Sequence, residues 1–270
     1  MIVAQGAALR IIQGAEAEMD FSNKTVLVTG AGSGLGRAMS IGFAQDGARV
    51  VGIGRHESAL AETRRLCGVG RMAFVVGDVA SESDVAAAFA LAKREFGPVD
   101  ILVNNAAQYP KVAFLASPFA EWRGAIDTNV IGTALCCRLA LPDMLERGFG
   151  RIINVGTFAW LGPIANSSAY SASKAAIRPF TKSIALEIDR SRFPDVLVNE
   201  FIPGEFRTGM SERGEDPSAA YPHLKVVVSL PSGGPTGETF FRSDMLRESV
   251  GRRQRVMQLV SKLTLGLVKA

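Results

Sequence analysis

The chain has few of the residues that mark a disulfide-stabilised or metal-binding protein. Its 270 residues include only three cysteines and two histidines. Three cysteines are too few for a disulfide scaffold, so a cytoplasmic location is expected. His56 and His223 have no partners at ligand spacing, so no metal site is predicted. The chain also lacks an uninterrupted apolar run of about 18 residues, so no transmembrane span is predicted.

Excess positive charge is missing from most of the chain. The net charge is +4, but residues 242–270 alone contribute +5, which leaves −1 for residues 1–241. A nucleic-acid partner is therefore not expected, because such binding needs a basic surface on the domain itself. Apolar residues of the tail fall at helical spacing, which predicts a basic amphipathic helix over 243–270. That helix suits a contact between subunits, packing on its own domain or, less well, a membrane surface.

Short apolar runs alternate with helical patterns along most of the sequence. The apolar runs span residues 25–29, 49–54, 71–76, 101–103, 151–155 and 196–201. This alternation predicts an α/β fold, a doubly wound parallel sheet of Rossmann type in a single domain over 19–242. Such sheets bind ligands beyond the carboxyl ends of their strands. Residues 1–18 show no apolar period and are predicted to be a flexible extension.

A glycine-rich turn joins the first strand to the first helix. Gly30, Gly34 and Gly36 enclose Ser33 and Leu35. Glycines let the backbone approach a pyrophosphate, and a helix N-terminus offers free N–H groups to it. The turn alone is a weak sign, because a tight strand-to-helix connection gives the same pattern. Its place after the first strand of a βαβ unit favours dinucleotide binding.

Tyr170 and Lys174 form the second chemical pattern. They are four residues apart, so they share one face of a predicted helix. An ammonium beside a phenol favours the phenolate and lowers the phenol pKa from about 10. Tyr170 is then suited to act as an acid toward a carbonyl and a base toward an alcohol.

Six motifs in this order and spacing resemble the short-chain dehydrogenase/reductase family over about residues 21–210. They are Thr29-Gly30-x-x-x-Gly34-x-Gly36, Asp78, Asn104-Asn105-Ala106-Ala107, Thr128-Asn129-Val130, Tyr170-x-x-x-Lys174 and Pro203-Gly204-x-x-x-Thr208. The resemblance implies a strand order of 3-2-1-4-5-6-7. It also implies hydride transfer between a nicotinamide cofactor and a small-molecule carbonyl or secondary alcohol.

The same resemblance implies four catalytic side chains: Asn129, Thr157, Tyr170 and Lys174. Tyr170 exchanges the proton, Lys174 tunes Tyr170 and holds the nicotinamide ribose, and Asn129 supports a proton relay. Thr157 stands where the family has serine and keeps the hydroxyl. Gly156 and Trp160 replace a common second serine and a common glycine, and Trp160 either narrows the substrate pocket or only packs. These departures leave a cofactor-binding regulator with little turnover as the alternative.

The cofactor-binding residues implied are Gly30, Ser33, Gly34, Leu35, Gly36, Arg55, Asp78, Val79, Asn105, Ala106, Tyr170, Lys174, Pro203, Gly204 and Thr208. NAD enzymes place an acid at the end of the second strand for the ribose 2′-hydroxyl. Here Arg55 stands there, and no acid comes before Glu57. A guanidinium pairs with a 2′-phosphate, so NADP is predicted over NAD, although Ser33 supplies no second basic residue. An NAD-dependent alcohol dehydrogenase is the alternative.

The resemblance becomes weaker after Thr208. Only residues 209–216 separate it from a helical pattern over 217–230, so a short lid and an open pocket are expected. Residues 230–241 look like the last strand of carbonyl-reductase-like members of the family. We also expect a homodimer or homotetramer.

Overall fold

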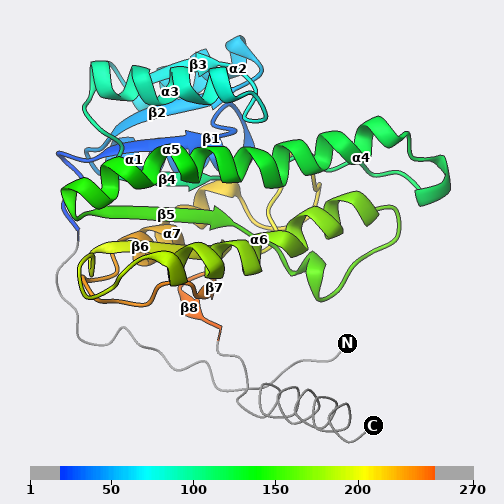
Figure 1. Ribbon diagram of the computed structural model, residues 1–270. Helices are drawn as coiled ribbons and strands as arrows, with labels where there is room; N and C mark the ends of the chain where they lie inside the picture. The colour runs from blue at the N-terminus through cyan, green and yellow to red at the C-terminus, as the bar shows by residue number, and fades with distance from the viewer. Residues whose placement is uncertain (1–18, 247–270) are drawn as a thin grey trace, which may run out of the picture.

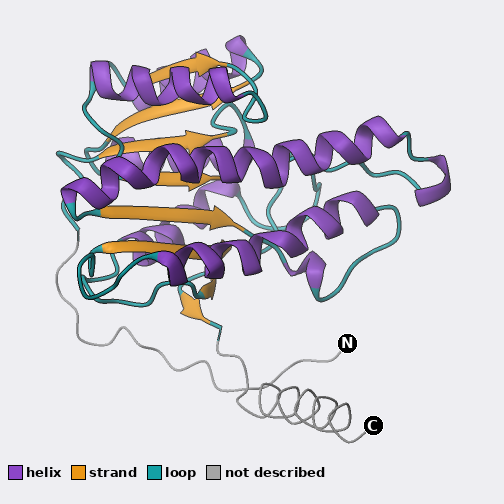
Figure 2. Ribbon diagram, viewed as in Figure 1, coloured by secondary structure: helices purple, strands orange, loops and turns teal. Residues whose placement is uncertain are grey.

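The computed structural model of the chain describes residues 19–246. One sheet runs through the domain in the order β3-β2-β1-β4-β5-β6-β7-β8. Strands β1 to β7 are parallel, and helices cover both faces of the sheet (Figures 1 and 2). The predicted doubly wound fold and the order of the first seven strands are therefore confirmed. The predicted extension over 1–18 and most of the predicted tail helix lie outside the described residues.

The strands are β1 (Thr25–Thr29), β2 (Arg49–Gly54), β3 (Met72–Val76), β4 (Ile101–Asn104), β5 (Gly150–Val155), β6 (Val196–Ile202), β7 (Thr239–Phe241) and β8 (Asp244–Met245). The α-helices are α1 (Gly34–Gln45), α2 (Glu57–Cys67), α3 (Glu82–Glu95), α4 (Phe119–Ile126), α5 (Gly132–Arg147), α6 (Ser168–Glu187) and α7 (Ala220–Val228). Shorter helical turns are η1 (Phe114–Ala116), η2 (Asp127–Ile131), η3 (Phe158–Trp160) and η4 (Pro217–Ala219).

The central strands are buried on both faces, which explains their continuous apolar sequences. In β1, Val26 and Val28 belong to the hydrophobic core that includes Phe43 of α1 and residues of α7. The intervening Leu27 belongs to the opposite core, with residues of α3 and α5. This alternation fixes the register of β1, because a shift by one residue would exchange its two faces.

Residues 119–147 form one extended run of helix. α4 passes into η2, a π-helical segment, which continues into α5. Pro142 does not end this run, since it lies inside α5. The π-helical segment holds Asn129, which is fully buried.

Two expectations for the end of the domain are wrong. Of residues 230–241, only the last three form a strand, because Gly233 and Gly237 adopt positive φ angles that place them in turns. The helix predicted from residue 243 does not begin there, because β8 turns back through Arg242 (φ 55°) and pairs antiparallel with β7. The domain therefore extends past the predicted boundary at 242 and includes β8.

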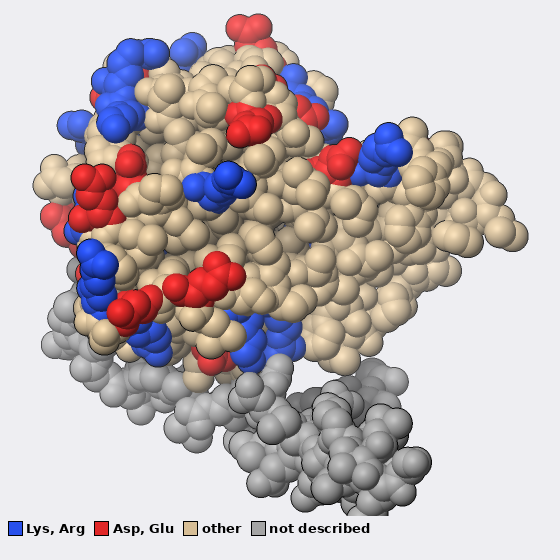
Figure 3. Space-filling model, in the orientation of Figure 1, with Lys and Arg blue, Asp and Glu red and all other residues tan. Residues whose placement is uncertain are grey.

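Figure 3 shows one face of the molecule, on which Lys and Arg alternate with Asp and Glu. The projecting end, where η1 and the start of α4 lie, carries few charges (Figures 1 and 3). Its exposed apolar side chains include Phe114, Leu115 and Phe119. Between residues 19 and 246, no helix combines the length and the apolar character needed to cross a bilayer.

Candidate active site

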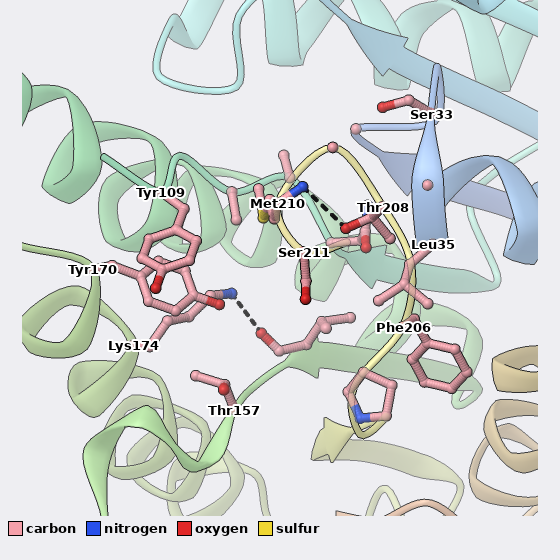
Figure 4. A pocket seen from close by; sticks show the side chains of 18 of the residues that line it. Ser33, Leu35, Tyr109, Thr157, Tyr170, Lys174, Phe206, Thr208, Met210 and Ser211 are labelled. Atoms are coloured by element: carbon pink, nitrogen blue, oxygen red, sulfur yellow. Dashed lines mark hydrogen bonds between the residues drawn. The ribbon is translucent and has the colours of Figure 1, made fainter. Parts of the chain in front are cut away.

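A cleft of about 2100 Å³ lies at the carboxyl ends of the parallel strands (Figure 4). Its lining includes almost all of the sequence-predicted site residues: Gly30, Ser33, Gly34, Leu35, Arg55, Asp78, Val79, Asn105, Ala106, Thr157, Tyr170, Lys174, Pro203, Gly204 and Thr208. Gly36 and Asn129 do not line the cleft. Gly36 lies against Gly30 and Asn105, and Asn129 is hydrogen-bonded to Gln108. No cluster of three or more His, Cys, Asp or Glu side chains in the described part of the chain is arranged to hold a metal ion.

The glycine turn is held tightly between β1 and α1. Gly30 (φ 65°) and Gly34 (φ 51°) adopt the left-handed region, which favours glycine. A Cβ at Gly36 would overlap the Gly30 carbonyl oxygen and the Asn105 side chain. Asn105 itself donates from Nδ2 to the Thr29 carbonyl oxygen at 2.9 Å. The structure thus assigns Asn105 a supporting role at the turn in addition to its place on the cleft wall.

The N-terminus of α1 fits a dinucleotide pyrophosphate. Ser33 occupies the N-cap position without a side-chain capping bond, and the first turn of α1 contains no acidic residue. The N–H groups at this end are consequently free of a capping side chain, and the helix dipole favours an anion there. The glycine turn in front of them leaves no Cβ in the way at Gly30 and Gly34.

Residues 209–216, where the sequence predicts a short lid, follow Thr208, and several of them line the cleft. Thr208 pairs with Ser211 through backbone hydrogen bonds of 2.8 and 3.2 Å, and its Oγ1 accepts from the Met210 N–H at 3.1 Å. A Cβ at Gly34 would lie 3.2 Å from Thr208 Cγ2, so this loop reaches the glycine turn. Figure 4 shows Thr208, Met210 and Ser211 arching over one side of the cleft.

Arg37 is a functional support that the sequence interpretation missed. Its Nη2 donates to the Gly32 carbonyl oxygen at 2.6 Å, and its Nε donates to Thr63 Oγ1 at 3.1 Å. The side chain therefore ties the glycine turn to α2. Arg37 directly follows the glycine motif, but its bonding partner in α2 cannot be found from spacing alone.

The adenosine end of the predicted site lies beyond β2 and β3. Arg55 is exposed at the end of β2, and its guanidinium makes no ion pair with any residue between 19 and 246. Asp78 follows β3 and accepts a hydrogen bond from the Ala80 N–H at 2.9 Å. Both residues line the cleft, so a cation and a carboxylate face this end of it.

Tyr170 lies at the other end of the cleft, with its ring stacked on Tyr109. The ring centroids are 4.3 Å apart (Figure 4). Burial raises the pKa of Tyr170 to about 12, a hydrogen bond with Thr157 lowers it, and the nearby Tyr109 phenol raises it. The expected lowering of this pKa is not observed, because burial outweighs the favourable contacts. Tyr170 is therefore held as a protonated phenol at neutral pH.

Lys174 is buried one helical turn after Tyr170 in α6. Its Nζ donates to the carbonyl oxygen of Val155 at 2.7 Å (Figure 4). Burial lowers the pKa of Lys174 to about 8, and the charge of Glu200 opposes this shift. The ammonium form thus predominates at neutral pH, although only 4% of the residue is exposed.

Asn129 connects the loop after β4 to α6. Its Oδ1 accepts from the Gln108 N–H at 2.7 Å, and its Nδ2 donates to the Gln108 carbonyl oxygen and to Ser173 Oγ. These bonds position the segment that leads to Tyr109. The role in a proton relay that the resemblance implies for Asn129 stays a prediction.

Comparison with known proteins gives a consistent result. The family model described as short chain dehydrogenase matches residues 24–218. An uncharacterized oxidoreductase of Staphylococcus aureus (strain USA300) is 31% identical over 190 residues, which cover 70% of this chain and 81% of the relative. An uncharacterized oxidoreductase of Staphylococcus saprophyticus is 33% identical over 196 residues, covering 72% and 82%. A solved short chain dehydrogenase/reductase family protein has a TM-score of 0.74 at 31% identity, covering 83% and 97%.

Proposed function

We propose, on the premise that the chain belongs to the short-chain dehydrogenase/reductase family, that it is an NADP(H)-dependent oxidoreductase acting on a carbonyl or secondary alcohol. The observation that carries this proposal is the position of Tyr170. Its phenol lines, together with Thr157, the same cleft whose other end is formed by the glycine turn. A reacting group and a dinucleotide cradle thus share one space.

The chain's own residues supply the proton chemistry in this proposal. A bound nicotinamide would supply or accept the hydride. The Thr157 and Tyr170 hydroxyls position the substrate oxygen, and Tyr170 donates its proton as that oxygen gains negative charge. Because the pKa of Tyr170 is about 12, the proton is present at neutral pH. Lys174 lies on the same face of α6, where its ammonium stabilises the phenolate that remains.

NADP(H) is proposed over NAD(H) because of Arg55. This cation at the end of β2 has no carboxylate bound to it in the described chain, so it is free to pair with a 2′-phosphate. We expect NADPH to bind more tightly than NADH. Arg55→Ala should weaken NADPH binding by about 1–3 kcal/mol, roughly 5- to 150-fold in Kd, and should change NADH binding little.

The experiment is a fluorescence titration of both reduced cofactors. Arg94→Ala is the matched control, because Arg94 is an exposed arginine of α3 that does not line the cleft. Equal dissociation constants for NADPH and NADH in the wild-type protein would overturn the NADP proposal and leave the NAD-dependent alcohol dehydrogenase.

A cofactor-binding regulator with little turnover is the second candidate. It is favoured by the departures at Thr157, Gly156 and Trp160, which lie around the predicted catalytic hydroxyls. NADPH consumption with a panel of ketones separates the two candidates. The predicted cytoplasmic location and the predicted homodimer or homotetramer stay predictions.

A further inference from the structure

The middle of β6 contains a fully buried carboxyl group. Glu200 has no exposed surface, although it stands in the apolar strand Val196–Ile202. Its Oε2 accepts a hydrogen bond from Thr239 Oγ1 of β7 at 2.6 Å. Its Oε1 has no hydrogen-bond partner. A half-bonded carboxyl group in a core is costly unless a charge nearby favours it.

The unbonded oxygen lies under Gly156, next to the catalytic hydroxyl of Thr157. A Cβ at position 156 would overlap Glu200 Oε1. The glycine where the family commonly has a second serine is therefore explained: any side chain at 156 would take the space of this carboxyl group. Gly156 and Glu200 therefore belong to one structural feature.

Two cations of α6 face this carboxyl group. Lys174 and Arg178 are one helical turn apart. Burial raises the pKa of Glu200, and the Thr239 hydrogen bond and the charges of Arg178 and Lys174 oppose that rise, so these groups favour the carboxylate form. The Arg178 guanidinium also lies 4.9 Å from the Trp160 ring centroid, so the third unusual residue belongs to the same cluster. Trp160 does not line the cleft, which supports the packing interpretation of this residue. In the sheet, Glu200 is paired in register with Asn154 of β5 and Thr239 of β7, whose side chains are neutral.

We propose that Glu200 is a positioning residue that acts through Lys174: it is the buried counter-charge that holds the Lys174 ammonium at the floor of the cleft. The hydrogen bond of Lys174 to Val155 goes to a neutral carbonyl and supplies no charge. Glu200 supplies it through space from the adjacent strand, without a direct ion pair between the two side chains, and it raises the pKa of Lys174 against the effect of burial. The role in the reaction rests on the function proposed above, whereas the charge pairing does not.

The pairing has a signature in the pH dependence of stability. The pKa of Lys174 is about 8 in the folded chain, below the ordinary value of 10.5. Between these values the unfolded chain binds more protons, so this residue makes stability rise with pH from about 8. Glu200→Gln removes the counter-charge and lowers the pKa of Lys174 further. The rise should then begin about 1 pH unit lower, since an opposite charge shifts a pKa by about 1–3 units.

The test measures Tm from pH 6 to pH 10.5 for the full chain, roughly the interval that the Lys174 pKa shift predicts. Glu200→Gln is compared with wild type, with Lys174→Met and with the double variant. The readout is the difference between each variant's profile and the wild-type profile, because the raised pKa values of the buried Cys67 and Cys136 make stability fall over the same pH range. Lys174→Met should remove the Lys174 contribution, and Glu200→Gln should cause no shift of the alkaline profile in that background. Glu187→Gln, on the exposed surface of α6, is the matched control and should leave the profile unchanged. If Glu200→Gln does not fold, Gly156→Ser with Glu200→Ala fills the same space without the charge.

Activity provides the second measurement. In NADPH-dependent ketone reduction, Glu200→Gln should lower kcat with little change in KM. The alkaline limb of the pH–rate profile should move to lower pH by the same number of pH units as the stability profile. A stability profile identical to wild type would overturn the inference, whatever the activity. A shifted stability profile in a protein that reduces no ketone would uphold the charge pairing and overturn the proposed function.

Discussion

The two halves of the cleft are built by different means. At the ends of β1 and β2, the half predicted for the nucleotide is shaped by backbone: Gly30, Gly34 and Gly36 leave space that added atoms would fill. At the ends of β5 and β6, the half with the proton chemistry is shaped by side chains whose burial and charge set their behaviour. Tyr170 stays protonated there, and Lys174 stays charged beside Glu200.

This difference explains where the chain departs from its family's pattern. The glycine turn keeps every family glycine, because each position is constrained by its φ angle or by a close neighbour. In the chemical half, Gly156 replaces the family's common second serine, and Glu200 occupies the space that a side chain at 156 would need. Side-chain clusters can be rebuilt if charge and volume are kept together, whereas a backbone cradle has fewer alternatives.

The largest expected effect is in the chemical half. Tyr170→Phe removes the proton donor and keeps the ring that stacks on Tyr109, so turnover should fall about 1000-fold, within the range for general acids. NADPH binding should remain within about fivefold of wild type, because a phenol hydroxyl contributes about 1 kcal/mol or less to binding. Steady-state kinetics and cofactor titration measure both.

Tyr221→Phe is the matched control for this change. The Tyr221 hydroxyl donates to Asp46 at 2.7 Å, on the α1 side of the sheet and away from the cleft. It should leave kcat unchanged. If Tyr170→Phe kept more than about a tenth of the wild-type rate, the remaining activity would be far higher than expected after removal of a general acid. The proton donor would then have to be another group.

The second effect is in the nucleotide half and concerns stability. Gly36→Ala places a Cβ against the Gly30 carbonyl and the Asn105 side chain. We expect the free energy of unfolding to fall by about 1–3 kcal/mol, as in other overpacked sites, together with a loss of NADPH affinity. Denaturant unfolding measures the first. Gly162→Ala, with open space around its Cβ, should change stability by less than about 0.5 kcal/mol. Equal stability of the two variants would mean that the turn is not tightly packed.

Much of the fold could be predicted from the sequence, because the signals are local. Strand and helix alternation placed β1 to β6 and their helices. Ser81, a residue type favoured at N-caps, caps α3 by accepting from the Asp84 N–H at 3.3 Å. The reversal into β8 was missed, since it depends on pairing with β7 and on a positive φ at Arg242. Such a turn has no local sequence signal when the residue is not glycine.

The candidate site shows the same division. The positions along the cleft follow from motif spacing, but the pKa of Tyr170 depends on burial that includes Tyr109, which is 61 positions away in the sequence. Glu200 did give a signal, a carboxylate inside an apolar strand run. Its meaning required the fold, because Gly156, Lys174 and Thr239 reach it from three other elements.

The last effect separates hydroxyl chemistry from shape. Thr157→Val keeps the branched shape and removes the hydroxyl that bonds Tyr170, so kcat for ketone reduction should fall about 100-fold, comparable to loss of one oxyanion donor. The Tyr170 pKa should also rise, because the hydrogen bond that lowers it is gone. Thr157→Ser, the matched variant, keeps the hydroxyl and should retain the wild-type rate within a few-fold. NADPH affinity should be unchanged in both variants, since Thr157 lies in the chemical half. If the valine variant were as fast as wild type, the Thr157 hydroxyl would have no catalytic role, and the contrast between the two halves would rest on Tyr170 and Lys174 alone.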